Sequence, residues 1–242
     1  MDFPLNLAEY FLSLAIITAG SLLQGSVGFG LGLLGVPLLI LIEPTLVPGP
    51  LLLMAFFLNI LVSRREWRDM DLKSIKWVLV GRVLGTVIAA AIMTILARNT
   101  LSLLLGFLVL LAVVISAGGF NLSLTPGNLF SAGSLSGFMA TTCAVGGPPL
   151  ALIFQRERGT RLRGNLAGIF LIGTVLSIAS LIVIKRFGFT ELYLALALLP
   201  GILLGFILSN RTSKILDKGF IRPAVLVVAT LSAGVVIARN LM

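Results

Sequence analysis

The sequence contains no histidine and a single cysteine, Cys143, and charged residues make up only 11% of its 242 positions. One cysteine excludes a disulfide framework within the chain. The nine acidic residues lie near the N-terminus or at the edges of apolar segments: Asp2, Glu9, Glu43, Glu66, Asp69, Asp71, Glu157, Glu191 and Asp217. Acid–base catalysis, nucleophilic catalysis and metal binding need clustered titratable groups. The sequence therefore predicts no enzyme activity, no metal site and no cofactor.

Soluble domains carry about a quarter of charged residues, so this chain has too few to cover a water-facing surface. Its hydrophobic content is 58% and its mean hydropathy +1.12. Apolar runs such as 78–97, 101–117 and 166–184 approach the ~20 residues with which a helix crosses a bilayer, and the alternation of a membrane barrel is absent. The sequence predicts an all-α integral membrane protein.

The net charge of +9 comes from cations that gather in three short linkers between apolar segments. Linker 64–76 holds five cations and three acids, whereas 156–163 and 211–222 each hold four cations and one acid. Basic loops of this kind stay on the cytoplasmic side. The charge therefore predicts a cytoplasmic membrane face and a lipid bilayer as partner, and argues against nucleic acid.

Eight hydrophobic segments are expected, and two of them are interrupted. Segment 7–42 is too long for one crossing, since 36 helical residues would extend about 54 Å across a ~30 Å core. It contains the glycine-rich stretch 24–32, and segment 128–154 contains the glycine- and proline-rich stretch 140–149. Both segments are predicted to be broken helices. The eight segments are 7–42, 46–62, 77–97, 101–118, 128–154, 164–184, 191–209 and 220–238.

The order of a broken helix followed by three spans occurs twice, which indicates an internal duplication. Gly25, Gly35 and Pro37 align with Gly137, Gly147 and Pro149 at an offset of 112. Glycines at 81 and 85 align with those at 201 and 205 at an offset of 120. The first repeat is expected in 1–118 and the second in 128–242, with 119–127 as linker.

The basic linkers favour one topology for these halves. If both interrupted segments crossed the membrane fully, linker 156–163 would lie on the opposite side from the other two. If both fold back as re-entrant hairpins, all three linkers lie inside. We prefer the hairpin model, in which the two halves form an inverted repeat of the kind transporters use to build a site at the membrane midplane.

Two breaks that meet at bilayer depth would collect main-chain N–H groups and helix N-termini, which attract anions. Unpaired main-chain groups cost several kcal/mol each in lipid, so such breaks persist only inside protein or beside a polar cavity. The alternative is that the glycines permit close helix packing. The candidate substrate-binding residues are Gln24, Gly25, Ser26, Gly28, Phe29, Gly30, Thr141, Thr142, Cys143, Gly146, Gly147, Asn59 and Arg82.

Three of these candidates have a second interpretation or a weaker case. Arg82 either snorkels to the nearby membrane interface or gives positive potential to an anion pathway. Asn59 is a weaker polar candidate near the inner end of segment 46–62. Cys143 lies inside the second interruption, where a lone cysteine is usually a small apolar filler.

The stretches 24–37 (QGSVGFGLGLLGVP) and 136–149 (SGFMATTCAVGGPP) resemble the paired glycine-rich motifs of the TauE/SafE family of sulfite-exporter-like permeases. The resemblance extends over nearly the whole chain in length, segment order and duplication. It implies an inner-membrane permease for sulfite, sulfonates or related sulfur-containing anions. Ala140 and Ala144 depart from the pattern, because glycines are expected at these positions. The matching motif positions are Gly25, Gly28, Gly30, Gly32, Gly35, Pro37, Gly137, Gly146, Gly147, Pro148 and Pro149.

The expected function is therefore transport of a small sulfur-containing anion, such as sulfite or an organosulfonate, through a site between the two breaks. An anion channel with the same site, and a membrane scaffold whose glycines serve packing, are the alternatives. A homodimer is compatible with so small a protein.

Overall fold

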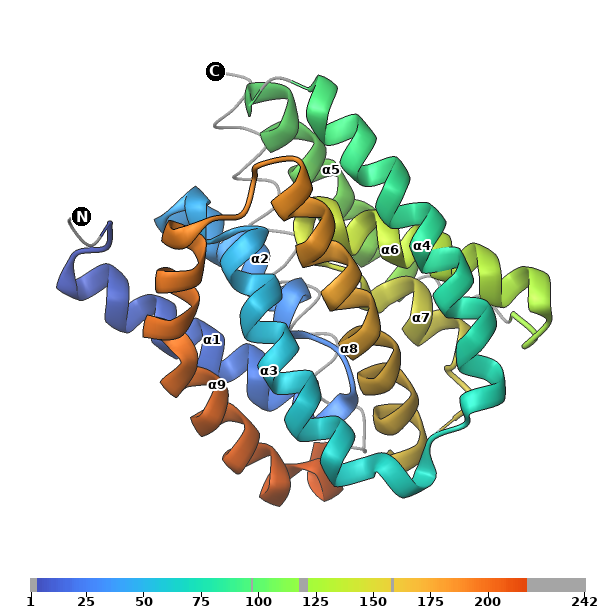
Figure 1. Ribbon diagram of the computed structural model, residues 1–242. Helices are drawn as coiled ribbons and strands as arrows, with labels where there is room; N and C mark the ends of the chain where they lie inside the picture. Colours follow the sequence, from blue (N-terminus) through green and yellow to red (C-terminus); the bar gives the residue numbers. More distant parts are fainter. Residues whose placement is uncertain (1–3, 97, 118–121, 158, 217–242) are drawn as a thin grey trace.

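Every regular element in the described part of the chain is a helix (Figure 1), as the composition predicts. The computed structural model describes residues 4–96, 98–117, 122–157 and 159–216. The α-helices are α1 (Leu7–Val27), α2 (Leu31–Ile42), α3 (Gly49–Glu66), α4 (Leu72–Ile95), α5 (Arg98–Ala117), α6 (Pro126–Cys143), α7 (Gly147–Ile153), α8 (Gly159–Val183) and α9 (Phe189–Leu216). Two short 3₁₀ helices, η1 (Pro44–Leu46) and η2 (Trp67–Asp69), follow α2 and α3.

These bounds follow the predicted segments closely. Segments 7–42 and 128–154 each form two helices with a break between them, as expected. The remaining helices extend further into the charged linkers than the apolar runs do, because arginine and lysine are good helix formers. The predicted segment 220–238 lies outside the described residues.

The surface of the helix assembly is apolar, as a lipid environment requires. Four stretches of the described helices are long and apolar enough to cross a membrane: 7–27, 75–95, 159–183 and 189–213. Outward-facing side chains on α4 and α9 are aliphatic, for example Val80, Val87 and Ile207, which are 54–60% exposed. A soluble helix would place charged side chains on such a face.

Helices α3 and α8 lie together in the middle of the assembly (Figure 1). Helix α1 packs along α9 on one side of them, and α6 packs along α4 on the other side. Both flanking pairs run parallel, because residues early in one helix contact residues early in the other.

Glycines bring α4 and α6 into backbone contact. A Cβ atom added to Gly81 would overlap the carbonyl oxygen of Phe130, and one added to Gly85 would overlap that of Ser134. Only a residue without a side chain allows the two main chains to approach so closely.

The α1–α9 pair is built in the same way. A Cβ atom at Gly201 would lie 3.0 Å from the carbonyl oxygen of Leu14, and one at Gly205 would overlap that of Thr18. The two glycine pairs that align at an offset of 120 therefore have the same packing role in both flanking pairs.

The chain folds back at the first break. Helix α2 starts beside the middle of α1, because a Cβ atom on Gly20 would lie 3.2 Å from the Cα atom of Leu31. The first half of α1 lies beside the first half of α9, where the Tyr10 hydroxyl donates to the carbonyl of Ala197 at 3.1 Å. Helix η1, which follows α2, also packs against α9. Both ends of the α1–α2 pair thus lie toward the end of the assembly where α9 begins.

The chain also folds back at the second break, toward the opposite end. A Cβ atom on Gly146 would lie 3.0 Å from the carbonyl oxygen of Ser136 in the preceding helix. After α7, the Glu157 carboxylate accepts a hydrogen bond from the Asn165 side chain of α8 at 2.7 Å. The α6–α7 pair therefore returns to the end at which α8 begins.

The linkers 64–76 and 156–163 and the described residues 211–216 of the third linker lie at this same end, the lower end of Figure 1. Arg161 pairs with Asp71 at 3.1 Å and so joins the second linker to the first. Arg65 donates to the Asn210 side chain at 2.7 Å and joins the first linker to the end of α9. We call this the basic-linker end.

The glycine contacts predict an asymmetric response to added methyl groups. Gly85→Ala would push α4 away from α6, and overpacking of this kind costs about 1–3 kcal/mol. Gly127→Ala is the matched control, because Gly127 lies in α6 with no atom near the added methyl group. In detergent, Gly85→Ala should lower the thermal unfolding midpoint, by about 2–4 °C per kcal/mol. Equal midpoints for the two variants would contradict the close α4–α6 contact.

Candidate functional site

The first break is short and depends on glycine. Helix α1 ends at Val27, and Gly28 and Gly30 have φ angles of +102° and +142°, which disfavour any L side chain. The Gln24 side chain accepts a hydrogen bond from the main-chain N–H of Leu31 at 3.2 Å and so caps the start of α2. The predicted interruption 24–32 was therefore too wide, since 24–27 form the last turn of α1.

The second break has the same form with different residues. Helix α6 ends at Cys143, and Ala144 adopts a φ of +57°, which is unusual for a residue with a side chain. Helix α7 begins at Gly147, and the two prolines that follow lack N–H groups. The predicted interruption 140–149 is likewise narrowed to 144–146.

The two breaks correspond at an offset of 116, with Cys143 opposite Val27 and Gly147 opposite Leu31. The motif alignment at 112 is thus one helical turn away from the structural equivalence. A shift of four residues keeps the same face of a helix, so it leaves the pattern of small residues nearly unchanged. In the structural alignment Ala144 corresponds to Gly28.

The two breaks touch. A Cβ atom on Gly32 would overlap the carbonyl oxygen of Ala144, and one on Gly147 would lie 2.9 Å from the Cβ atom of Phe29. A cavity of about 40 Å³ lies between them, on a measure by which a single water molecule needs ~10–15 Å³. We call it the central cavity. It is lined by Gln24, Phe29, Gly30, Leu31, Gly32, Leu33, Leu51, Leu52, Ala55, Asn59, Arg82, Ala140, Ala144, Val145, Gly146, Gly147, Pro148, Phe170 and Thr174.

The first turn of helix α2 lines this cavity. Gly32 and Leu33 belong to this turn, whose N–H groups have no partner within the helix, and the N-cap residue Gly30 has no side chain to cap them. The side-chain amide of Gln24 donates to Oδ1 of Asn59 at 3.0 Å. This contact uses the amide oxygen of Asn59 and does not involve its donor group, Nδ2. Main-chain and amide donors therefore converge on one wall.

Arg82 supplies the charge of the central cavity. It lies ten residues into α4, about 15 Å along the helix, and is only 1% exposed. Its Nη1 donates to Ser136 Oγ at 2.9 Å, and its guanidinium lies 5.7 Å from the ring of Phe170. A Cβ atom on Gly173 would overlap the guanidinium, so this glycine makes room for it.

No ion pair joins Arg82 to a carboxylate in the described part of the chain, and its Nε is buried without a hydrogen-bond partner there. Because the Arg82 side chain is buried, its guanidinium does not reach the surface of the described helices, as snorkelling to the interface would require. A desolvated, unpaired cation is costly.

The structure gathers seven of the sequence candidates around the central cavity: Gln24, Phe29, Gly30, Asn59, Arg82, Gly146 and Gly147. The others lie behind its walls. Thr141 bonds to the hydroxyls of Thr86 and Ser177 at 3.2 and 2.8 Å. Thr142 and Cys143 donate to carbonyls one turn back in α6.

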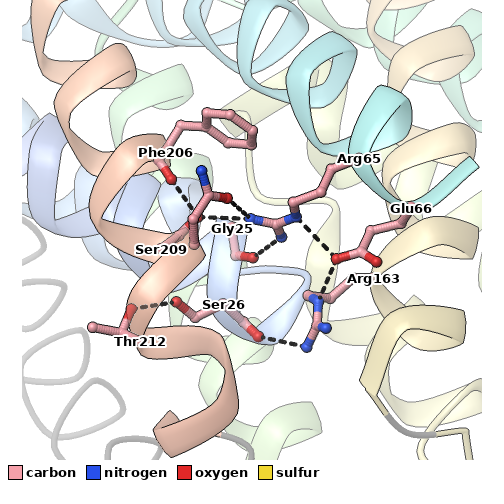
Figure 2. A network of polar contacts seen from close by, with 9 residues as sticks. Gly25, Ser26, Arg65, Glu66, Arg163, Phe206, Ser209 and Thr212 are labelled. Atoms are coloured by element: carbon pink, nitrogen blue, oxygen red, sulfur yellow. Dashed lines mark hydrogen bonds and ion pairs between the residues drawn. The ribbon is translucent and has the colours of Figure 1, made fainter.

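Gly25 and Ser26 face a second polar cluster (Figure 2), and Gly28 lies beside it. Arg65 donates to the carbonyl of Gly25, and Arg163 donates to that of Ser26 at 3.2 Å. Gly28 packs against Arg163, since a Cβ atom there would lie 3.4 Å from the Cα of Arg163.

Phe170 and Thr174 line the cavity and Ser136 bonds to Arg82 beside it, and none of these three was among the candidates. The first two lie on the cavity side of α8, whose sequence is apolar all round, and a single threonine gives no signal there. Ser136 links the charge to the second break, because its hydroxyl donates to the carbonyl of Gly146 at 2.6 Å and accepts from Arg82. Its position at the start of the motif 136–149 could have identified it.

Apolar outward faces, two broken helices and a buried cationic cavity define a polytopic helical membrane protein with an internal polar site. The comparison with family models identifies its kind: the model of the sulfite exporter TauE/SafE family matches residues 12–236. The chain belongs to this family of membrane transporters. No curated protein and no solved structure matches the chain.

The second break predicts a stabilising substitution. Ala144→Gly should raise the thermal unfolding midpoint, since a left-handed conformation costs a residue with a side chain about 1–2 kcal/mol. Ala132→Gly, in the interior of α6, is the matched control and should lower the midpoint, because glycine costs about 1 kcal/mol in a helix. Shifts of the same sign would contradict the assigned break.

Proposed function

We propose that the protein is a permease for a small sulfur-containing oxyanion, sulfite or a compact sulfonate, which binds in the central cavity between the two helix breaks. Arg82 provides the positive charge, and Asn59 adds an amide donor. The N–H groups in the first turn of α2 place the positive end of the helix dipole at the anion. Substrate-binding residues on this proposal also include Gln24, which positions both α2 and Asn59.

The charge of Arg82 is the observation on which this proposal rests. Burying a guanidinium without a carboxylate costs several kcal/mol, and the protein lowers that cost only through Ser136 and the face of Phe170 among the described residues. A bound anion would supply the missing counter-charge.

The dimensions of the cavity favour a compact ligand. About 40 Å³ is room for a few water molecules, which suits a pyramidal or tetrahedral oxyanion. The side chains of Phe29 and Phe170 line the same space, so a larger organosulfonate would need them to move.

The two breaks contribute unequally on this proposal. Helix α2 offers N–H groups in its first turn, whereas Pro148 and Pro149 remove two donors from the first turn of α7. Gly146 instead turns its carbonyl toward Ser136. The anion would therefore contact the first break and Arg82, with the second break as an uncharged wall.

We further propose that the halves 1–118 and 128–242 form an inverted repeat around the site, joined by 119–127. The exchange of α1 with α6 and of α4 with α9 converts one flanking pair into the other, with α3 and α8 at the centre. The α1–α2 and α6–α7 pairs fold back toward opposite ends. Rocking of one half against the other would then alternate access to the cavity.

On this proposal the basic-linker end faces the cytoplasm and the protein lies in the inner membrane. The cations of linkers 64–76 and 156–163 gather at that end, and positive loops stay inside.

Substitution of Arg82 tests the proposal. In proteoliposomes, Arg82→Gln should reduce saturable uptake of labelled sulfite by about 10- to 100-fold, since a hydrogen bond to a charged group is worth about 1.5–3 kcal/mol. Arg82→Lys keeps the positive charge but loses the planar guanidinium with its several N–H donors. Its uptake rate should lie between that of Arg82→Gln and that of the unsubstituted protein. Arg64→Gln is the control, because Arg64 is exposed and away from the cavity. Uptake by Arg82→Gln at the control rate would exclude this site, and ohmic current in place of saturable counterflow would indicate a channel.

A further inference from the structure

A cluster of charged side chains lies directly behind the central cavity on its basic-linker side (Figure 2). Arg65 Nε and Arg163 Nε both donate to the same oxygen of Glu66, at 2.9 and 3.0 Å. The side chains of Glu66 and Arg163 are each 7% exposed and that of Arg65 is 21% exposed. This cluster joins the end of α3 to the start of α8.

The cluster also holds the last turn of α1. The carbonyls of Gly25 and Ser26 lie at the C-terminal end of the helix, where the helix dipole is negative and main-chain acceptors lack helical partners. Arg65 donates to the first carbonyl and Arg163 to the second. The residue before Gly25 is Gln24, which lines the cavity. The cluster is thus adjacent to the cavity wall.

Helix α9 completes the closure. Arg65 Nη1 donates to Ser209 Oγ at 3.0 Å and to Asn210 Oδ1 at 2.7 Å. The hydroxyls of Ser26 and Thr212 lie 3.0 Å apart. Four helices, α1, α3, α8 and α9, therefore meet at the two guanidinium groups.

A second cluster, made of neutral side chains, lies beside another part of the cavity wall. Thr141 follows Ala140, which lines the cavity, and its hydroxyl bonds to those of Thr86 in α4 and Ser177 in α8. Thr141 is the structural counterpart of Gly25 at the offset of 116. Charge-assisted hydrogen bonds are about twice as strong as neutral ones. Breaking the contacts of the charged cluster therefore costs more free energy than breaking those of the neutral cluster.

We propose that Arg65, Glu66 and Arg163 form the gate between the central cavity and the basic-linker end, and that the Thr86–Thr141–Ser177 cluster closes the other end more weakly. Release of the α1 carbonyls lets the tip of the first hairpin move away from α3, α8 and α9 and opens the cavity toward the basic linkers. The proposal rests on the central cavity as the anion site, but it is a statement about access and can be measured without transport.

Cysteine accessibility tests the gate. The background is Cys143→Ala, which removes the single native cysteine, and Ala55→Cys in α3 places a thiol in the cavity lining. Arg68→Cys, in a separate variant, marks the basic-linker end, because Arg68 is exposed in η2. A membrane-impermeant maleimide is added to sealed vesicles of each orientation, and the preparation in which position 68 reacts exposes the basic-linker end.

With the gate intact, the cavity thiol should react slowly in that preparation. Arg65→Gln and Arg163→Gln should each raise its rate at least tenfold there, with no rise in the opposite preparation. Arg161→Gln is the matched control, since Arg161 belongs to the same linker and its ion pairs within the described ranges are with Asp71 and Glu157, outside the gate. It should leave the rate unchanged.

A rate within twofold of the control for both gate variants would overturn the proposal. An equal rise from both sides would overturn it as well, because it would indicate general loosening, and gel filtration of each variant checks that it remains folded. If the side-specific rise occurs and sulfite is not transported, the gate stands and the proposed substrate fails.

Discussion

Helix α1 ends inside the protein, and each main-chain group left at its break has to find a partner there, because lipid offers none. The partners come from distant parts of the chain. Arg65 and Arg163 bond the last carbonyls of α1, and Gln24 caps the start of α2. At the second break, Ser136 bonds the carbonyl of Gly146. The contacts that satisfy the breaks therefore also fix the walls of the central cavity.

The main-chain groups at the two breaks have different kinds of hydrogen-bond partner. The first break has charged and amide partners, and its second helix keeps its first-turn N–H groups. The second break has hydroxyl partners, a strained alanine at 144 and two prolines that remove donors. The cavity between the two breaks thus has polar groups mainly on the side of the first break, with Arg82 reaching it from α4. This inequality is compatible with a ligand of fixed orientation.

The breaks could be predicted from the sequence, since dense glycine and proline within an apolar run is rarely compatible with a continuous helix. Their limits could not, because residues such as Gln24 and Thr141 fit equally well in a helical last turn. The burial of Arg82 could not be predicted from the neighbouring sequence either. It depends on Gly173, which is distant in sequence and leaves room for the guanidinium. Glu66 and Arg163 resemble ordinary linker charges, and only the packing of four helices shows that they are buried. The family was recognised from two short motifs, because the order of small residues survives a one-turn error in alignment.

Three buried or half-buried arginines differ in how the protein neutralises their charge. Arg65 and Arg163 share Glu66 and the negative end of α1, so the protein itself neutralises most of their charge. Arg82 has a hydroxyl and an aromatic face, and its Nε remains without a partner among the described residues. On the proposed function, Arg82 is the position where an entering anion would gain most, because no carboxylate among the described residues neutralises its guanidinium. On the same proposal, a carboxylate in the cavity would compete with the anion for Arg82, and the acidic residues of the sequence lie instead near the N-terminus or at segment edges.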